Sequence, residues 1–145
     1  MARDTQRSRL YGWELAQLQS TTLLRAEDTV PLGEEAAQKL VIQVWRDFRH
    51  LGRTPSLKVM GDRGRGWTNG TMIKLSSQYM DTQTRWYVLH EIAHCILIKG
   101  GKDHLASHGP EFCAVYADLL DKYATGWRPE LVGSMKSAGL KVASR

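Results

Sequence analysis

The sequence predicts an α+β fold in which a small antiparallel or mixed sheet packs on helices. Three observations predict it. Apolar residues recur at helical spacing over residues 34–51 and 110–123, two short segments near 57–60 and 71–76 alternate between apolar and polar, and residues 88–98 form an apolar stretch suited to a buried helix. A chain of 145 residues has the natural size of one domain, which we expect to span its whole length, 1–145.

The first half of the chain predicts two helices. Residues 5–19 carry Tyr11 and Leu15 at helical spacing, which predicts a short amphipathic helix. Residues 34–51 carry a wide apolar stripe with acidic residues at its start and a glycine after its end. This second helix is expected to pack behind the helix formed by residues 88–98.

The sheet is predicted next. Residues 57–60 and 71–76 alternate as strands do, and Asn69-Gly70 is a strong signal for a hairpin turn. We expect two or three short antiparallel strands here, with Trp67 on a strand between the other two. An edge strand of such a sheet can pair with an extended peptide.

Three helices are predicted after the sheet. Asp81 or Thr82 is suited to cap a helix that runs to about Lys99, where two glycines stop it. Residues 110–123 and 128–138 predict the last two helices.

The apolar stretch contains a His-Glu-x-x-His motif at residues 90–94. On a helix, residues four apart lie on one face, so His90 and His94 can hold one zinc ion between them. Glu91 lies next to the first ligand, where a carboxylate can accept a proton from a zinc-bound water. The motif therefore predicts a zinc site with Glu91 as its general base.

Catalytic zinc usually takes three protein ligands and one water, so a third ligand is expected elsewhere. The spacing typical of metzincins fails, because the sixth residue after the motif is a glycine. Glu111 would suit a thermolysin-like site, and His104 and His108 are the other candidates. We favour His108, because Gly-Pro follows it and predicts a helix start, which is a rigid support for a ligand.

The motif, followed after fourteen residues by His-Gly-x-x-Phe at 108–112, resembles the SprT-like zinc peptidases over about residues 80–120. This resemblance implies a minimal zincin-like domain with the motif helix at its core. The site residues that it implies are the zinc ligands His90, His94 and His108, with Glu91 as the base. Residues 3–14 also resemble a group of short metallohydrolases from actinobacteria and their phages, whose members are assigned by motif, and this second resemblance implies a metal site.

The first functional hypothesis is a zinc-dependent hydrolase, foremost a metallopeptidase that cleaves a peptide or protein substrate with Glu91 as general base and a zinc-bound water as nucleophile. The alternative is a zinc-stabilised binding or structural module without turnover, associated with a phage or with DNA. Tyr79, Tyr87 and Tyr116 are candidate donors to the oxyanion, although buried tyrosines more often serve packing.

The amino-acid composition limits which classes of partner we expect for this chain. The chain has 42% hydrophobic residues, no apolar run of membrane-spanning length and a polar N-terminus, so we expect a cytoplasmic protein with no membrane partner. A net charge of +5 weakly favours acidic partners or nucleic acid. Basic residues gather between positions 46 and 65, either as a phosphate-contacting surface or as a solvated helix end and turn, and the second reading is the commoner one for a charge run. The candidate nucleic-acid-binding residues are Arg49, Arg53, Arg63, Arg65 and Trp67.

Overall fold

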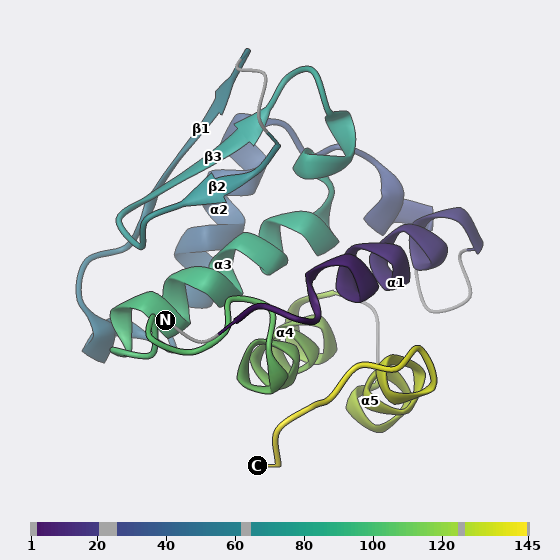
Figure 1. Ribbon diagram of the computed structural model, residues 1–145. Coiled ribbons are helices and arrows are strands. Elements are labelled where there is room, and N and C mark those ends of the chain that lie inside the picture. Colours follow the sequence, from purple (N-terminus) through teal and green to yellow (C-terminus); the bar gives the residue numbers. More distant parts are fainter. Residues whose placement is uncertain (1–2, 21–25, 62–64, 125–126, 145) are drawn as a thin grey trace.

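The computed structural model describes residues 3–20, 26–61, 65–124 and 127–144. Within these residues, five α-helices and a mixed sheet of three strands form an α+β fold (Figure 1). The helices are α1 (Arg7–Ser20), α2 (Glu34–Trp45), α3 (Arg85–Lys99), α4 (Pro110–Tyr123) and α5 (Arg128–Ser137). The strands are β1 (Ser56–Met60), β2 (Trp67–Thr68) and β3 (Met72–Ser76), and short 3-10 turns are η1 (Ala26–Thr29), η2 (Arg49–Leu51) and η3 (Met80–Gln83).

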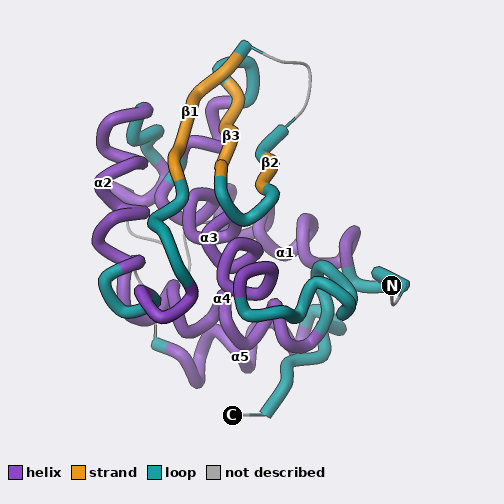
Figure 2. The backbone as a smooth tube through the Cα atoms, turned by 90° about the vertical axis from the view of Figure 1, so that its left-hand side faces the viewer, coloured by secondary structure: helices purple, strands orange, loops and turns teal. Residues whose placement is uncertain are grey.

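Helix α3 lies at the centre of the arrangement, with the sheet on one side and α4 on the other (Figures 1 and 2). Its side chains are buried from Trp86 to Leu97, apart from the half-buried His94. The predicted caps Asp81 and Thr82 are wrong, because both lie in η3, and the Thr84 hydroxyl instead accepts a hydrogen bond from the backbone N–H of Tyr87. None of the helices in the described ranges is long and apolar enough to span a lipid bilayer.

The strand order is β1-β3-β2, and the sheet is mixed. Strand β2 pairs antiparallel with β3, as predicted, but β1 pairs parallel with β3, with Leu57 opposite Ile73. The expectation that 57–60 and 71–76 run antiparallel is therefore wrong. Alternation predicts which face of a strand is buried, and here Leu57, Ile73 and Leu75 do face the core, but it carries no information on strand direction.

The predicted Asn69-Gly70 hairpin joins β2 to β3. The Asn69 side chain accepts hydrogen bonds from the backbone N–H groups of Thr71 and Met72, both at 3.0 Å. Gly70 has φ +94°, and a Cβ there would lie 2.9 Å from a methyl carbon of Ile98 on α3. The turn thus places β2 at the edge of the sheet against α3.

The first two helices depart from their predictions in detail. Helix α1 buries Leu10 and Trp13, whereas Leu15, which was expected on the inner face, is 52% exposed. Helix α2 buries the predicted stripe but ends at Trp45 instead of residue 51, and its last turns are replaced by a turn and η2. The Trp45 indole N–H donates to the Gly52 carbonyl at 3.0 Å, which holds this turn against the helix.

Candidate metal centre

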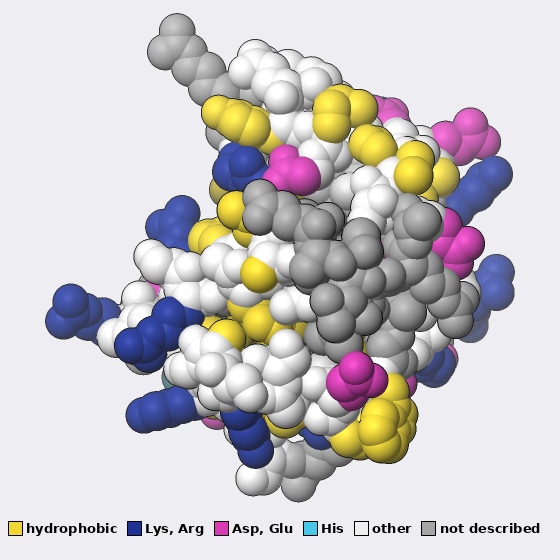
Figure 3. Space-filling model, turned by 90° about the vertical axis from the view of Figure 1, so that its right-hand side faces the viewer, with side chains coloured by type: hydrophobic (Ala, Val, Ile, Leu, Met, Phe, Trp, Pro, Cys, Tyr) yellow, Lys and Arg dark blue, Asp and Glu magenta, His cyan; other side chains and the backbone are white. Residues whose placement is uncertain are grey.

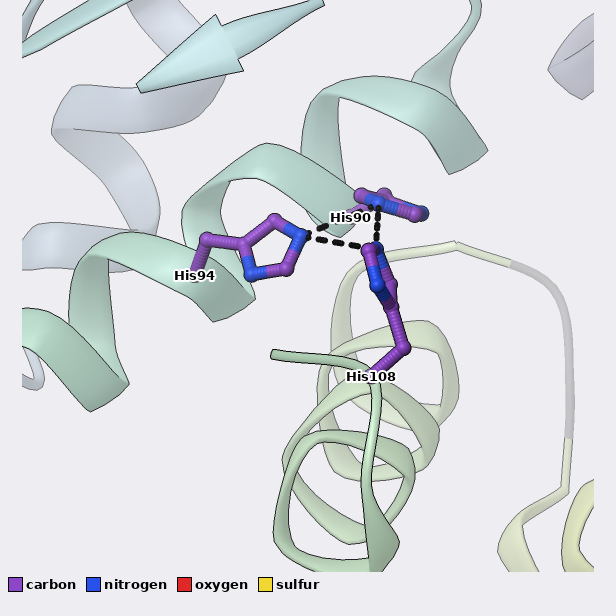
Figure 4. A group of neighbouring side chains, drawn as sticks. All are labelled: His90, His94 and His108. Atoms are coloured by element: carbon purple, nitrogen blue, oxygen red, sulfur yellow. Dashed lines mark hydrogen bonds between the residues drawn. The ribbon is translucent and has the colours of Figure 1, made fainter. Parts of the chain in front are cut away.

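Three imidazoles from two segments meet at one point (Figure 4). His90 and His94 come from adjacent turns of α3, and His108 stands two residues before α4. The three Nε2 atoms are 3.2 Å apart for His90 and His94, 3.1 Å for His94 and His108, and 3.4 Å for His90 and His108. The three histidines can hold a metal ion.

The spacing of these nitrogens fits a tetrahedral ion. Zinc binds imidazole nitrogen at about 2.0–2.1 Å, and the edge of a tetrahedron with such bonds is about 3.3 Å. The three observed separations lie within about 0.2 Å of that edge.

Two carboxylates hold the rings from behind. The Nδ1 of His90 donates to Oε2 of Glu14 at 2.9 Å, and the Nδ1 of His108 donates to Oδ2 of Asp4 at 2.8 Å. Because a carboxylate only accepts hydrogen bonds, each ring keeps its proton on Nδ1 and turns a lone pair on Nε2 towards the shared point. Such carboxylate–histidine pairs orient metal ligands and make them more basic.

Glu14 and Asp4 both belong to the N-terminal segment. The Tyr116 hydroxyl donates a further hydrogen bond of 2.6 Å to the same Glu14 oxygen. Gln6 fastens the segment, because its amide donates to the His108 carbonyl at 3.0 Å while its oxygen accepts from the backbone N–H of Lys141 at 2.6 Å. Residues that lie more than 75 positions from the motif in the chain therefore support His90 and His108.

The electrostatic environment differs among the three rings. Burial holds the pKa of His94 well below its usual value, and the charges of His90 and His108 lower it further. Burial also lowers the pKa of His108, partly offset by Asp4. Burial alone would lower the pKa of His90, but the charge of Glu14 and the hydrogen bond to it raise it overall. The lowered pKa values of His94 and His108 favour the neutral form that binds a metal, whereas the raised pKa of His90 favours its protonated form.

Glu91 lies beside this cluster and is 3% exposed. Burial raises the pKa of its carboxyl to about 7, with His90 lowering it and Glu14 raising it. Gly66 approaches it closely, since a Cβ there would lie 2.8 Å from Oε1 of Glu91 and 2.5 Å from a ring carbon of Tyr87. Only a residue without a side chain fits between the carboxylate and β2.

Two neighbouring cavities open beside the cluster. The smaller, about 290 Å³, is lined by His94, His108 and Glu91 together with residues of β2. The larger, about 470 Å³, is lined by Tyr87 and by residues of α1. The cavities share three lining residues, namely Arg7, Tyr11 and Gly66. The cluster is therefore reached from an open cleft with α1 on one side and β2 on the other.

The structure separates the candidates for the third ligand. His108 joins the pair on α3, whereas His104 is exposed and its Nδ1 contacts the Gly101 carbonyl at 3.2 Å. Glu111 lies in the first turn of α4, outside the cluster formed among the described residues.

The candidate oxyanion donors lie at different depths. Tyr116 is buried and its hydroxyl is engaged by Glu14, and Tyr79 lies at the surface against Arg65. Tyr87 lies nearly parallel to the His90 ring, 5.0 Å between centroids, and lines the larger cavity.

Among the described candidates for nucleic-acid binding, no hydrogen bond or ring contact joins one candidate to another. Arg65 lines the larger cavity and is paired with Asp81, and the Trp67 ring lies under the Lys74 ammonium at 5.0 Å. Arg49 and Arg53 are exposed on and after η2, and Arg63 lies outside the described residues.

The sequence-based reasoning missed Asp4, Glu14 and Tyr11. Tyr11 lines both cavities, and its ring centroid is 5.7 Å from that of His90 and 5.3 Å from that of His108. Burial raises the pKa of the Tyr11 hydroxyl, and the charges of Glu91 and Glu14 raise it further. The sequence contains one signal for Glu14: it follows the apolar Leu10 by four residues. On a helix its carboxylate therefore lies on the same face as Leu10, which is expected to be buried.

Comparison of the chain with models of protein families, with curated proteins and with solved structures finds no match. Its function therefore has to be inferred from its own residues. The features that bear on chemistry are the three converging imidazoles, the two carboxylates behind them and the buried Glu91 at the cleft.

Proposed function

We propose that the chain is a zinc-dependent hydrolase, foremost a metallopeptidase of minimal zincin-like architecture. His90, His94 and His108 bind the zinc ion, and Glu91 is the general base. The observation that carries this proposal is the convergence of three imidazoles beside a buried carboxylate at the wall of an open cavity.

The donor set favours zinc. Three imidazole nitrogens at tetrahedral spacing, two of them fixed by carboxylates, form the ligand set of a catalytic zinc site, whereas calcium and magnesium prefer oxygen ligands. Structural zinc sites are usually closed by four protein ligands. Here three protein ligands come together among the described residues and a cavity adjoins them, which favours an enzyme over a structural module.

A zinc ion in this position supplies a Lewis acid that polarises a carbonyl group and makes water nucleophilic at neutral pH. Glu91 accepts the proton of the attacking water and then donates it to the leaving amine. Gly66 has no side chain to displace the Glu91 carboxylate, from which an added Cβ would lie only 2.8 Å away. Glu14 and Asp4 keep their histidines in the required tautomer throughout.

Tyr11 is suited to donate a hydrogen bond to the oxyanion. Its ring lies beside His90 and His108, and it lines the same cavity as Glu91. A phenol held protonated next to the reacting carbonyl stabilises the charge that develops there.

The edge strand supports a peptide as the substrate. Strand β2 is one of the two edge strands of the sheet, and both of its residues, Trp67 and Thr68, line the cavity that Glu91 also lines. An extended peptide can pair with such an edge and present its backbone carbonyls to the site.

The test combines metal analysis with cleavage. Purified protein is analysed for bound metal and incubated with a peptide library prepared from a whole proteome. We expect about one zinc per chain and cleavage that Glu91→Gln abolishes while its zinc content stays unchanged. Glu130→Gln, at an exposed position of α5, is the matched control and should cleave normally. A zinc-loaded protein that cleaves nothing in the library would refute the peptidase proposal.

A further inference from the structure

Among the charged residues that line the two cavities, one cationic side chain has no ion-pair partner in the described part of the chain. Each carboxylate of the cavity walls other than Glu91 has a resident partner: Asp4 pairs with His108, Glu14 with His90, and Asp81 with Arg65. Glu91 is reserved for the reaction in the proposed function. The remaining charged residue of the lining is Arg7.

Arg7 is exposed on the first turn of α1 and lines both cavities. Its guanidinium carbon lies 5.8 Å from the centre of the Tyr11 ring. No carboxylate of the described residues forms an ion pair with it. The guanidinium lies at the junction of the two cavities beside the Tyr11 ring and donates one hydrogen bond to the Tyr11 hydroxyl. Its other N–H donors are available to a ligand.

The larger cavity has room and walls for a side chain. The rings of Tyr11 and Tyr87 and the 52% exposed Leu15 provide apolar surface for methylene groups, and the two phenols provide hydroxyl donors. Gly66 stands where the cavities meet, and the absence of a side chain there keeps the passage from the Glu91 carboxylate open. A ligand bound at the histidines can thus extend past Gly66 into the larger cavity.

The surrounding surface supports an anionic ligand. Figure 3 views the side of the molecule towards which α1 runs in Figure 1, and Lys and Arg side chains project along both of its margins, with Asp and Glu side chains among those on the right. Basic groups on a protein surface attract anions and speed their encounter. This agrees with the net charge of +5.

We propose that the larger cavity is a specificity subsite for a carboxylate group of the substrate, and that Arg7 is its ionic partner. The inference rests on the proposed function, because it places the neighbouring part of the substrate at the three histidines. The carboxylate has two sources, an acidic side chain next to the scissile bond or the C-terminal carboxylate of the peptide. Arg7 determines specificity and takes no part in the bond-breaking step.

The test measures binding without turnover. Three peptide hydroxamates, which bind zinc through the hydroxamate, are titrated into the zinc-loaded full chain. One carries a Glu side chain and an amidated C-terminus, the second a Gln side chain and a free C-terminal carboxylate, and the third a Gln side chain and an amidated C-terminus. We expect one of the acidic probes to bind about tenfold tighter than the neutral probe, the effect of one charge-assisted hydrogen bond, and the tighter one identifies the source of the carboxylate.

Arg7→Gln should bring the acidic probe to the affinity of the neutral probe. Arg9→Gln is the matched control, since Arg9 is also exposed on α1 but belongs to neither cavity lining, and it should keep the preference. Equal binding of the three probes, or a preference that survives Arg7→Gln, would overturn the subsite while leaving the zinc site in place. If none of the probes binds, the accessible zinc site itself is refuted, and the subsite falls with it.

Discussion

Replacing Glu14 by glutamine is expected to weaken zinc binding about 10–100-fold, which corresponds to about 1.4–2.8 kcal/mol. One Glu14 oxygen accepts hydrogen bonds from both His90 Nδ1, at 2.9 Å, and the Tyr116 hydroxyl, at 2.6 Å. A glutamine oxygen can still accept from His90 and keep its tautomer, but the negative charge that offsets the positive charge on the ring and its ion is lost. The change therefore isolates the electrostatic contribution of a residue that supports a ligand without itself binding the metal.

The effects of Glu14→Gln and Asp4→Asn on zinc affinity can be ranked from the exposure of the two carboxylates. The Glu14 side chain is 8% exposed and the Asp4 side chain 23% exposed. Because solvent screens the more exposed carboxylate, Asp4→Asn should weaken zinc binding less than Glu14→Gln does. Glu35→Gln, on the exposed face of α2, removes the same charge far from the site and should have no effect.

The assay is competition for zinc with a chromogenic chelator at fixed pH, with thermal unfolding of the metal-free variants measured in parallel. The parallel measurement is needed because the other Glu14 oxygen is buried without a hydrogen-bond partner among the described residues. A glutamine amide placed there would lower the free energy of unfolding by about 1–3 kcal/mol without any change in metal chemistry. Equal zinc affinity of the unaltered protein and Glu14→Gln would refute the supporting role, as would a larger loss in Asp4→Asn.

Three further predictions test the site. His108→Ala should reduce zinc affinity by more than about 100-fold, since it removes a ligand and not merely a supporting group, whereas His104→Ala should bind zinc normally in the same competition assay; the reverse result would reassign the third ligand. Gly66→Ala should lower kcat about 100-fold with zinc affinity retained, because the added Cβ would lie 2.5 Å from a Tyr87 ring carbon and 2.8 Å from Oε1 of Glu91 and would displace both side chains. Unchanged kinetics would contradict this close approach. Tyr11→Phe should lower kcat about 10²–10³-fold with little change in zinc affinity, and a change confined to KM would exclude it as the oxyanion donor.

Much of the fold follows from local patterns. The helices at 34–45, 85–99 and 110–123 carry apolar stripes or long apolar runs that fit few other conformations, and the structure has helices there. The ends of these elements were less well predicted. The apolar stripe continues through Phe48 and Leu51, yet the helix stops at Trp45, because those side chains pack on the core from a turn as well as they would from a helix.

Strand direction lies beyond local patterns. Residues 57–60 and 71–76 have the side-chain alternation of strands, and the hairpin signal at Asn69-Gly70 fits an antiparallel neighbour. In the structure the antiparallel neighbour of β3 is β2, and β1 pairs with the other side of β3 in the parallel direction. The hydrogen-bonding groups of a strand serve either direction, so the choice depends on how the connecting residues and α3 pack.

The sequence by itself determined the part of the site that one helix builds. His90, Glu91 and His94 lie within two turns, so the helical repeat places both rings on one face whatever the rest of the chain does. The helix start after His108 singled out that residue over His104, and the structure brings it to the other two rings.

Only the tertiary structure decided which residues from other segments contact these imidazole rings. Asp4, Glu14 and Tyr11 reach them because α1 packs its inner face, with Leu10 and Trp13, against the core across a long separation in the chain. Helical periodicity is a local property, while the meeting of two distant segments depends on the burial that both gain together, and no single stretch of residues records that gain.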